Sequence, residues 1–254
     1  MRQVVALFFS MSAVLVAQDA PRQTFEVASV KPAPEDDGAD GHYTTGMPPA
    51  IEAHARRIDW PHVSLIGILC QAYGVKPLDI RAPDWMNQRR YMVAAKIPAD
   101  GPEGHIPEML QNLLADRFQM KQHWETSEES GYTLTVAKGG ARLKASAPDA
   151  KPGMSMRFNG HFEWTAETTD TLATALRVMM GRTVVNATNL AGAYDIELDA
   201  SPGSMPGFHF ADAQDSNFPT IFAALRDLGL ELVPGKVVVK RLVVDSALKV
   251  PVAN

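Results

Sequence analysis

The sequence contains only one cysteine, Cys70, so no disulfide can form within the chain and its stability has to come from packing. It has no cluster of lysines and arginines, and the formal net charge is −5. A nucleic-acid-binding protein, or one drawn to an anionic membrane, would carry such a cluster. Beyond residue 17, no apolar run approaches the roughly 20 residues that a membrane-spanning helix needs. The sequence therefore predicts no nucleic-acid partner and no membrane span in the mature chain.

The common signatures of catalysis are also missing. There is no His-Glu-x-x-His, no Gly-x-Ser-x-Gly, no phosphate loop and no Gly-x-Gly-x-x-Gly in the sequence. The 7 histidines are scattered, and no two of them have the helical spacing of metal ligands. The sequence thus predicts no catalytic residue, no metal and no cofactor.

The N-terminus has the layout of a secretory signal peptide. Arg2 supplies a positive charge, a mostly apolar run extends to Ala17, and polar Gln18 follows. We therefore predict that residues 1–17 are a signal peptide and that the protein is exported to the periplasm, cell envelope or medium. Leu15 is larger than the side chain preferred three positions before the cut, so an uncleaved anchor stays open as an alternative.

The rest of the chain is predicted to be an α+β fold made of two tandem repeats. Each repeat has the order helix, strand, strand, helix, strand, strand, with antiparallel sheets backed by helices. The similarity of Tyr91-Met-Val-Ala-Ala-Lys to Tyr194-Asp-Ile-Glu-Leu-Asp indicates an internal duplication. The predicted parts are an N-terminal strand with a long acidic loop (18–63), the first repeat (64–144), a linker (145–168) and the second repeat (169–254).

Local signals define the predicted elements. Ser64 is expected to cap the first helix, which ends at Gly74, and Gly181 is expected to end the first helix of the second repeat. Each repeat is expected to close with a hairpin, the first through Ser127–Gly131 and the second through Pro234–Gly235. Ala145–Gly160 is rich in Ala, Pro, Ser, Lys and Gly, which is typical of a linker.

The most distinctive local feature is Ala82-Pro-Asp-Trp85, where a carboxylate and an aromatic ring share a turn. Asp84 and Trp85 are therefore the candidate ligand-binding residues, suited to a sugar or a peptide. The alternative is that Trp85 fastens the loop to the sheet. Asp84 with Asp59 or Glu163 would be the pair that a glycosidase needs, but their sequence positions do not give their separation. Cys70 lies in an apolar helix and is expected to be a core residue.

Several motifs, in this order along the chain, resemble an exported family that is expanded in soil acidobacteria and known as a domain of unknown function. They are Phe25-Glu-Val-Ala-Ser-Val-Lys-Pro, Gln71-Ala-Tyr-Gly-Val, Ala82-Pro-Asp-Trp, Leu113-Leu-Ala-Asp-Arg-Phe, Asn189-Leu-Ala-Gly-Ala-Tyr-Asp and Leu228-Gly-Leu-Glu-Leu. The resemblance implies no catalytic residue. Some members of that family resemble fusions to membrane metalloproteases of the β-lactam-sensor type, which implies a sensing or binding role in the envelope.

The chain departs from this resemblance at Asn186-Ala-Thr-Asn189, where Asp-Lys-Thr-Gly is expected. The missing glycine is predicted to alter the turn before Tyr194. The order of elements is also similar to the short N-terminal domains of secretins and TonB-dependent receptors, a likeness of fold alone.

Two classes of function follow. The first is a non-catalytic protein of the cell envelope that binds a protein or peptide partner through an edge strand or a groove. The second is a secreted hydrolase of polysaccharide or peptide, whose acids and histidines would come from Pro202–Asp215 and from the loop after Pro32. The sequence favours the first.

Overall fold

The computed structural model describes residues 22–34, 46–49, 51–52, 55–98, 105–157, 160–201 and 218–253. The predicted signal peptide (1–17), residues 35–45 of the predicted acidic loop and Pro202–Asp215 lie outside the described residues.

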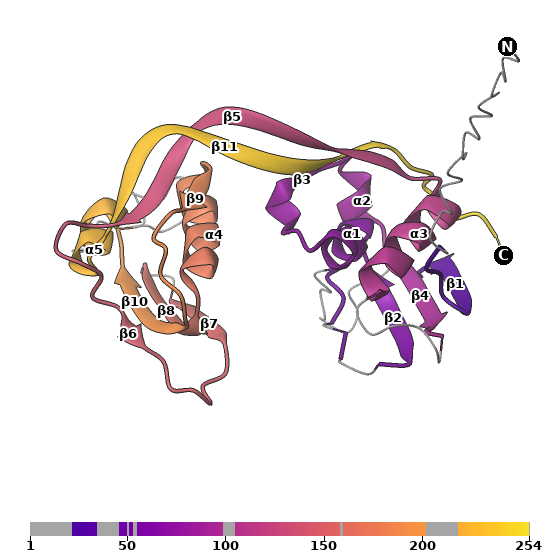
Figure 1. Cartoon of the computed structure of the whole chain (residues 1–254), viewed down its shortest axis with the longest axis horizontal. Helices are drawn as coiled ribbons and strands as arrows, with labels where there is room; N and C mark the ends of the chain where they lie inside the picture. Colours follow the sequence, from indigo (N-terminus) through magenta and orange to yellow (C-terminus); the bar gives the residue numbers. More distant parts are fainter. Residues whose placement is uncertain are drawn as a thin grey trace, which may run out of the picture. The chain divides into compact units, whose positions relative to one another are not determined.

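The described residues form a mixed α+β fold, as predicted (Figure 1). Two of its sheets are antiparallel, and the third contains parallel strand pairs. The elements are β1 (Val27–Pro32), β2 (Arg57–Val63), α1 (Leu65–Tyr73), the 3₁₀ turn η1 (Pro77–Asp79), β3 (Ile80–Arg81), α2 (Trp85–Gln88), β4 (Tyr91–Lys96), α3 (Ile106–Phe118), β5 (Lys121–Val136), β6 (Lys144–Ala145), β7 (Gly153–Arg157), β8 (His161–Glu167), α4 (Thr169–Met180), β9 (Val184–Asn186), β10 (Tyr194–Asp199), α5 (Ile221–Asp227) and β11 (Leu230–Ser246).

The chain divides into two compact units. Unit 1 consists of Met1–Glu125 together with Arg241–Asn254, and unit 2 of Thr126–Lys240. Unit 1 is therefore discontinuous in sequence, because the C-terminal segment returns to the N-terminal half of the chain.

Unit 1 is built around a three-stranded sheet of order β1-β4-β2, in which β4 pairs antiparallel with both neighbours. Helix α1 begins where the Ser64 hydroxyl accepts a hydrogen bond from the Gly67 amide at 3.0 Å. It ends at Gly74, whose φ of 63° is the left-handed conformation that favours glycine. Both ends of this helix lie where the sequence predicts them.

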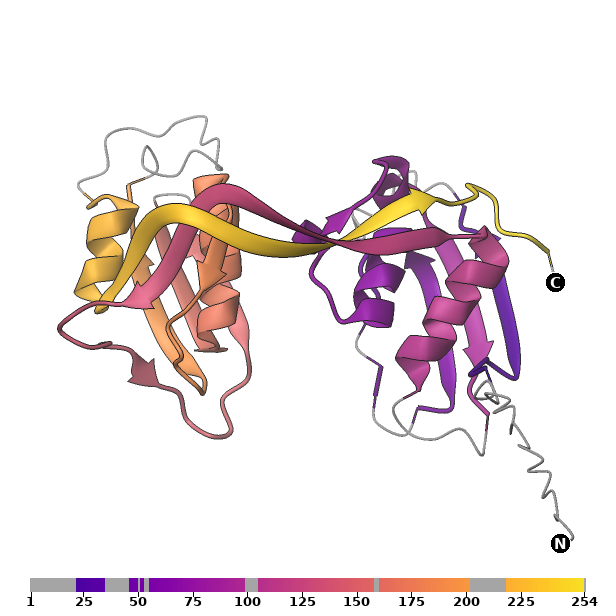
Figure 2. The same ribbon diagram turned by 45° about the horizontal axis from the view of Figure 1, so that its top comes forward.

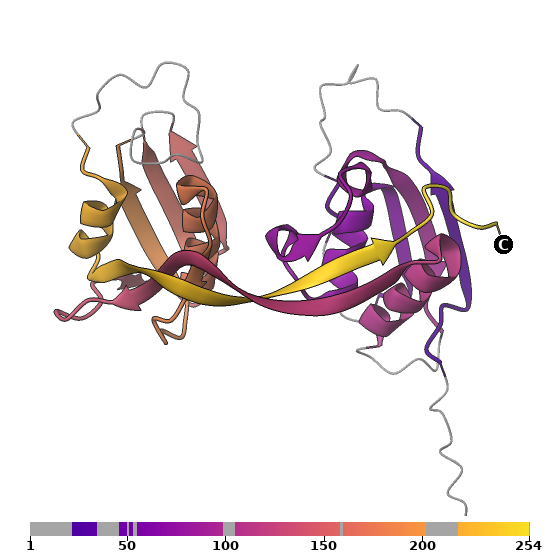
Figure 3. The same cartoon turned by 90° about the horizontal axis from the view of Figure 1, so that it is seen from above.

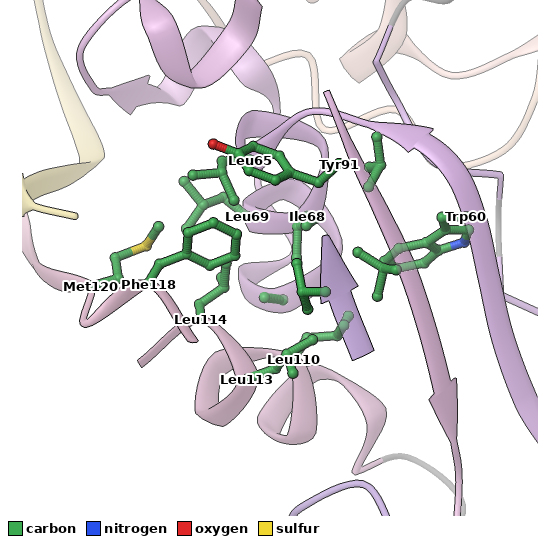
Figure 4. Close-up of a cluster of buried hydrophobic side chains, with 14 of the residues drawn as sticks. Trp60, Leu65, Ile68, Leu69, Tyr91, Leu110, Leu113, Leu114, Phe118 and Met120 are labelled. Atoms are coloured by element: carbon green, nitrogen blue, oxygen red, sulfur yellow. The ribbon is translucent and has the colours of Figure 1, made fainter. Parts of the chain in front are cut away.

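The core of unit 1 lies where α1, α3 and the sheet meet. Figure 4 shows side chains of α1 pointing toward those of α3, with Tyr91 of β4 beside them. Tyr91 and Phe118 meet edge to face, with ring centroids 5.0 Å apart. The fully buried apolar residues here include Val63, Leu65, Ile68, Leu69, Met86 and Phe118.

Both ends of the described chain bind helix α3 of unit 1. At the N-terminal end, the Arg22 guanidinium bonds the Asp116 carboxylate at 2.9 Å. At the C-terminal end, the Val252 amide donates to the Arg117 carbonyl at 2.7 Å. The two termini therefore belong to one unit.

Unit 2 contains a four-stranded sheet of order β6-β10-β8-β7, and Figure 2 shows α4 and α5 beside it. Its apolar core alternates along β8, where Phe162 and Trp164 are almost fully buried and His161 and Glu163 are not. Helix α4 is capped by the Thr168 hydroxyl, which accepts a hydrogen bond from the Thr171 amide at 3.2 Å, and it ends at Gly181 as predicted. The other core residues include Leu172, Leu176, Ile196, Leu198, Ile221 and Leu225.

The longest strands, β5 and β11, each contribute residues to both units. They are neighbours in a sheet of order β3-β11-β5-β9 and run next to each other in Figure 3. In unit 1, Leu242 of β11 pairs in parallel with Ile80 of β3. In unit 2, Tyr132 of β5 pairs in parallel with Val184 of β9. Each long strand thus begins in one unit and ends paired in the other.

The two predicted closing hairpins are wrong, because β5 and β11 run on without a turn. Gly131 does not mark a turn: a side chain there would meet the Thr183 carbonyl oxygen at 2.6 Å, so the glycine permits a close approach of two backbones. Pro234 lies within β11, outside the stretch that pairs with β3, which is Leu242 and Val243 in the described residues.

The predicted linker (145–168) is wrong as well, since it contains β7 and β8 of the unit 2 sheet. Composition before Gly160 suggested a linker, but the alternation of Phe162 and Trp164 with polar residues makes β8 a half-buried strand. The sequence analysis also left β2 without a prediction. The compact units do not coincide with residues 64–144 and 169–254, because the last strand of each predicted repeat continues into the other unit.

The turn before Tyr194 keeps a left-handed residue without the expected glycine. Asn189 has φ of 55°, a conformation that asparagine tolerates better than most residues. Nearby, the Asn186 side-chain amide donates to the Thr169 hydroxyl at 3.0 Å, and its oxygen accepts from the Thr188 amide at 3.0 Å. These bonds tie β9 to the start of α4.

We predict that Gly131→Ala destabilises the protein. The added carbon would lie 2.6 Å from the Thr183 carbonyl and 2.8 Å from Val237 Cγ2, so β5 and β9 would have to move apart. The expected loss in free energy of unfolding is about 1–3 kcal/mol, measured by urea denaturation. Gly139→Ala is the control, because its nearest neighbour is 3.9 Å away and no loss is expected. Equal stability of the two variants would contradict the prediction.

We also predict that cutting the chain between Ala147 and Ala150, before β7, leaves the two pieces bound together. The N-terminal piece would carry β3 and β5, and the C-terminal piece would carry β9 and β11. The pairs β3–β11 in unit 1 and β5–β9 in unit 2 would therefore each join the two pieces. Size-exclusion chromatography of the cleaved protein without denaturant should show one species containing both pieces. Separation of the pieces under these conditions would show that the exchanged strands contribute little.

Candidate functional site

The structure places the predicted site residues, Asp84 and Trp85, at the start of α2 in unit 1. Asp84 is exposed and makes no side-chain cap to the helix. Trp85 packs against the unit 1 core, and the Lys249 ammonium lies 5.7 Å from the centroid of its ring. Lys249 is itself held by a 2.8 Å bond from the Tyr91 hydroxyl to its carbonyl. Trp85 thus fastens the C-terminal segment, and ligand binding by Asp84 and Trp85 stays a prediction.

The other candidate acids have partners of their own. Asp59 forms a 3.0 Å ion pair with Arg57, and Glu163 bonds His161 at 2.7 Å. The alternative of a hydrolase relied on Pro202–Asp215 and on the loop after Pro32, most of which falls outside the described residues.

Cys70 is a buried core residue, as predicted. Burial raises the pKa of its thiol to about 11, and Asp79 adds to the shift. A thiol with this pKa is not a nucleophile at neutral pH.

The described residues bring one histidine between two carboxylates, at the ends of β8 and β10. His161 Nδ1 lies 2.5 Å from the Asp199 carboxylate, and its Nε2 lies 2.7 Å from the Glu163 carboxylate. The imidazole is 20% exposed, while the two carboxylates are about twice as open. His161 and Asp199 are register partners on adjacent strands, so backbone pairing positions two members of this cluster.

This arrangement favours the protonated imidazole. The hydrogen bond to Glu163 and then the one to Asp199 raise the pKa of His161 above its ordinary 6.5, and burial opposes them. An imidazolium with both N–H groups engaged is suited to holding two strands together. This cluster was not predicted from the sequence, because His161 and Glu163 lie in the segment predicted to be a linker.

The outer edge of β7 is the second feature that the sequence analysis missed. β7 pairs with β8, through a register from Gly153↔Thr165 to Arg157↔His161. In the part of the chain that the structure describes, no strand follows β7 on its other side. Met154 is 54% exposed there, and Ser155 is exposed as well. Such an edge presents unpaired backbone N–H and C=O groups.

Among the residues described, no group of three or more His, Cys, Asp or Glu side chains is arranged to hold a metal ion. Within the described ranges, no helix has both the length and the apolar character needed to cross a bilayer.

The fold and these side chains define an α+β protein with helix-backed sheets, an open strand edge and a histidine clamp. Its sequence matches, over residues 67–247, the model of a family described as a protein of unknown function, DUF3738. The chain belongs to that family. No curated protein and no solved structure matches it.

The His161 cluster predicts a pH-dependent contribution to stability. A folded-state pKa above 6.5 means that the contribution is fully present below the unfolded pKa and is lost as the pH rises through the raised value. His161→Gln should therefore lower the free energy of unfolding at pH 5, and the difference from wild type should shrink toward pH 9. Urea denaturation across this range measures it. His123→Gln is the control, because His123 is 52% exposed and Asp245 is its one ion-pair partner among the described residues. A difference independent of pH would refute the clamp.

Proposed function

We propose that this chain is an exported protein of the cell envelope that binds a partner without catalysis, by adding an extended peptide of that partner to strand β7. The open edge of β7 carries the proposal. Export is supported by the signal-peptide layout of residues 1–17.

The edges of the unit 1 sheet differ from β7 in a way that supports this choice. β2 carries Pro61, the ion pair of Arg57 with Asp59, and a register shift between Trp60 and Val63. β1 carries Lys31 and ends at Pro32. Prolines, charges and bulges are the devices by which proteins prevent unwanted strand pairing. β7 contains no proline, its pairing with β8 has no register shift, and its one charged residue, Arg157, is the last of the strand.

An extended peptide is the occupant that such an edge accepts. Its main chain would hydrogen-bond to the free backbone groups of β7, which gives affinity, and alternate side chains would give specificity. The exposed Met154 side chain is flexible and polarisable, so it can pack against partner side chains of different shapes.

We predict that Met154→Lys weakens partner binding at least tenfold, because a lysine on an edge strand opposes strand addition. The mature protein, carrying a photo-crosslinking residue at position 155, is first used to identify the bound segment in an envelope extract. Isothermal titration of that segment then gives the affinities. Hydrogen exchange should show amides of Gly153–Arg157 becoming protected on binding.

Val178→Lys is the matched control. It adds the same charge at an apolar side chain that is 44% exposed, but on helix α4 and not on a strand edge. Its affinity should equal that of wild type. Unchanged binding by Met154→Lys, protection of amides elsewhere, or turnover of a hydrolase substrate without a retained partner would contradict the proposal.

A further inference from the structure

Unit 2 contains an open pocket of about 540 Å³ at which three elements of the chain meet. Ser130, Gly131 and Tyr132 reach it from β5, and Gly235 and Lys236 from β11. Arg182 reaches it from the segment between α4 and β9. All of these residues belong to unit 2.

The pocket gathers positive charge and hydrogen-bond donors. Arg182 and Lys236 are both exposed, and the Lys236 ammonium lies 3.4 Å from the Ser130 hydroxyl. In the described part of the chain, Arg182 has no hydrogen-bond or ion-pair partner, and the Tyr132 hydroxyl has no hydrogen bond. The lining includes a guanidinium, an ammonium and two hydroxyl groups.

No acidic side chain lines the pocket among the residues described. The nearest acid in sequence is Glu129, which accepts a hydrogen bond from the Thr183 hydroxyl. Glu129 is not among the residues that line the pocket. The pocket therefore brings together two positively charged side chains, with no carboxylate in its lining, in a chain whose net charge is −5.

We infer that this pocket binds a small ligand through a carboxylate or phosphate group. The Arg182 guanidinium offers paired N–H groups that match two oxygens of such a group, and Lys236 adds a second charge. The Ser130 hydroxyl donates a further hydrogen bond. Tyr132, whose ring meets Phe222 edge to face at 5.6 Å, provides a fixed surface for the rest of the ligand. This inference does not depend on peptide binding at β7.

A structural role would also explain the presence of Arg182, and the experiment has to distinguish that role from ligand binding. It follows Gly181 at the end of α4, where a positive charge stabilises the helix dipole. That role would change stability and not ligand binding. It does not account for Lys236, which comes from a different element.

The test is an NMR titration of ¹⁵N-labelled protein comprising residues 18–254, at constant ionic strength and neutral pH. The two probes are inorganic phosphate and galacturonate, a sugar carboxylate. Saturable shifts are expected at the amides of Ser130, Gly131, Arg182, Gly235 and Lys236. The double variant Arg182→Ala with Lys236→Ala should bind at least tenfold more weakly. Arg182→Lys should fall between this variant and wild type, because it keeps the charge and loses the paired N–H groups.

The control is the double variant Lys138→Ala with Lys151→Ala, which removes two positive charges from exposed positions of unit 2 outside the pocket. It should bind like wild type. Saturation by both probes, or by one of them, supports the site and identifies the group that it prefers. Equal weakening in both double variants, shifts spread over the surface, or no saturation with either probe would overturn the inference. Thermal melting of each variant separates lost binding from lost stability.

Discussion

The pairing of β5 with β11 is the constraint on which the rest of the structure depends. Each of these strands completes a parallel pair in the unit where it ends, β11 with β3 in unit 1 and β5 with β9 in unit 2. Neither unit is therefore encoded by a continuous piece of the sequence. Non-local pairing of this kind is slow to form, because chain entropy is lost before the contacts are gained. Folding of one unit is tied to the presence of the other half of the chain.

Features set by local sequence were predicted well. The cap at Ser64 and the helix ends at Gly74 and Gly181 depend on residues within one turn of the helix, and all three are found. The closing hairpins were mispredicted because glycine and proline are common in turns, whereas Gly131 and Pro234 both lie within long strands. Thr183 approaches Gly131 across the sheet, and no local pattern reveals that approach.

The candidate functional residues divide in the same way: those in a local motif were predicted, and those brought together by strand pairing were not. Asp84 and Trp85 were found because they form a local motif, and Trp85 is occupied in packing against Lys249 and the core. The features that support a function lie on strands whose register decides their neighbours. His161 meets Asp199 only because β8 and β10 pair in one register, and Arg182 and Lys236 share a pocket only because β5, β9 and β11 come together. β7 and β8 were not predicted, because the composition near residue 150, rich in Ala, Pro, Ser and Lys, is typical of a linker. The alternation that indicates a strand begins only at His161.

The binding of both chain ends to α3 has a mechanical consequence. Arg22 and Val252 are both held by that helix of unit 1, so a pulling force applied between the termini acts on unit 1 alone. Unit 2, inserted between Glu125 and Arg241, lies outside the path of the load until unit 1 gives way.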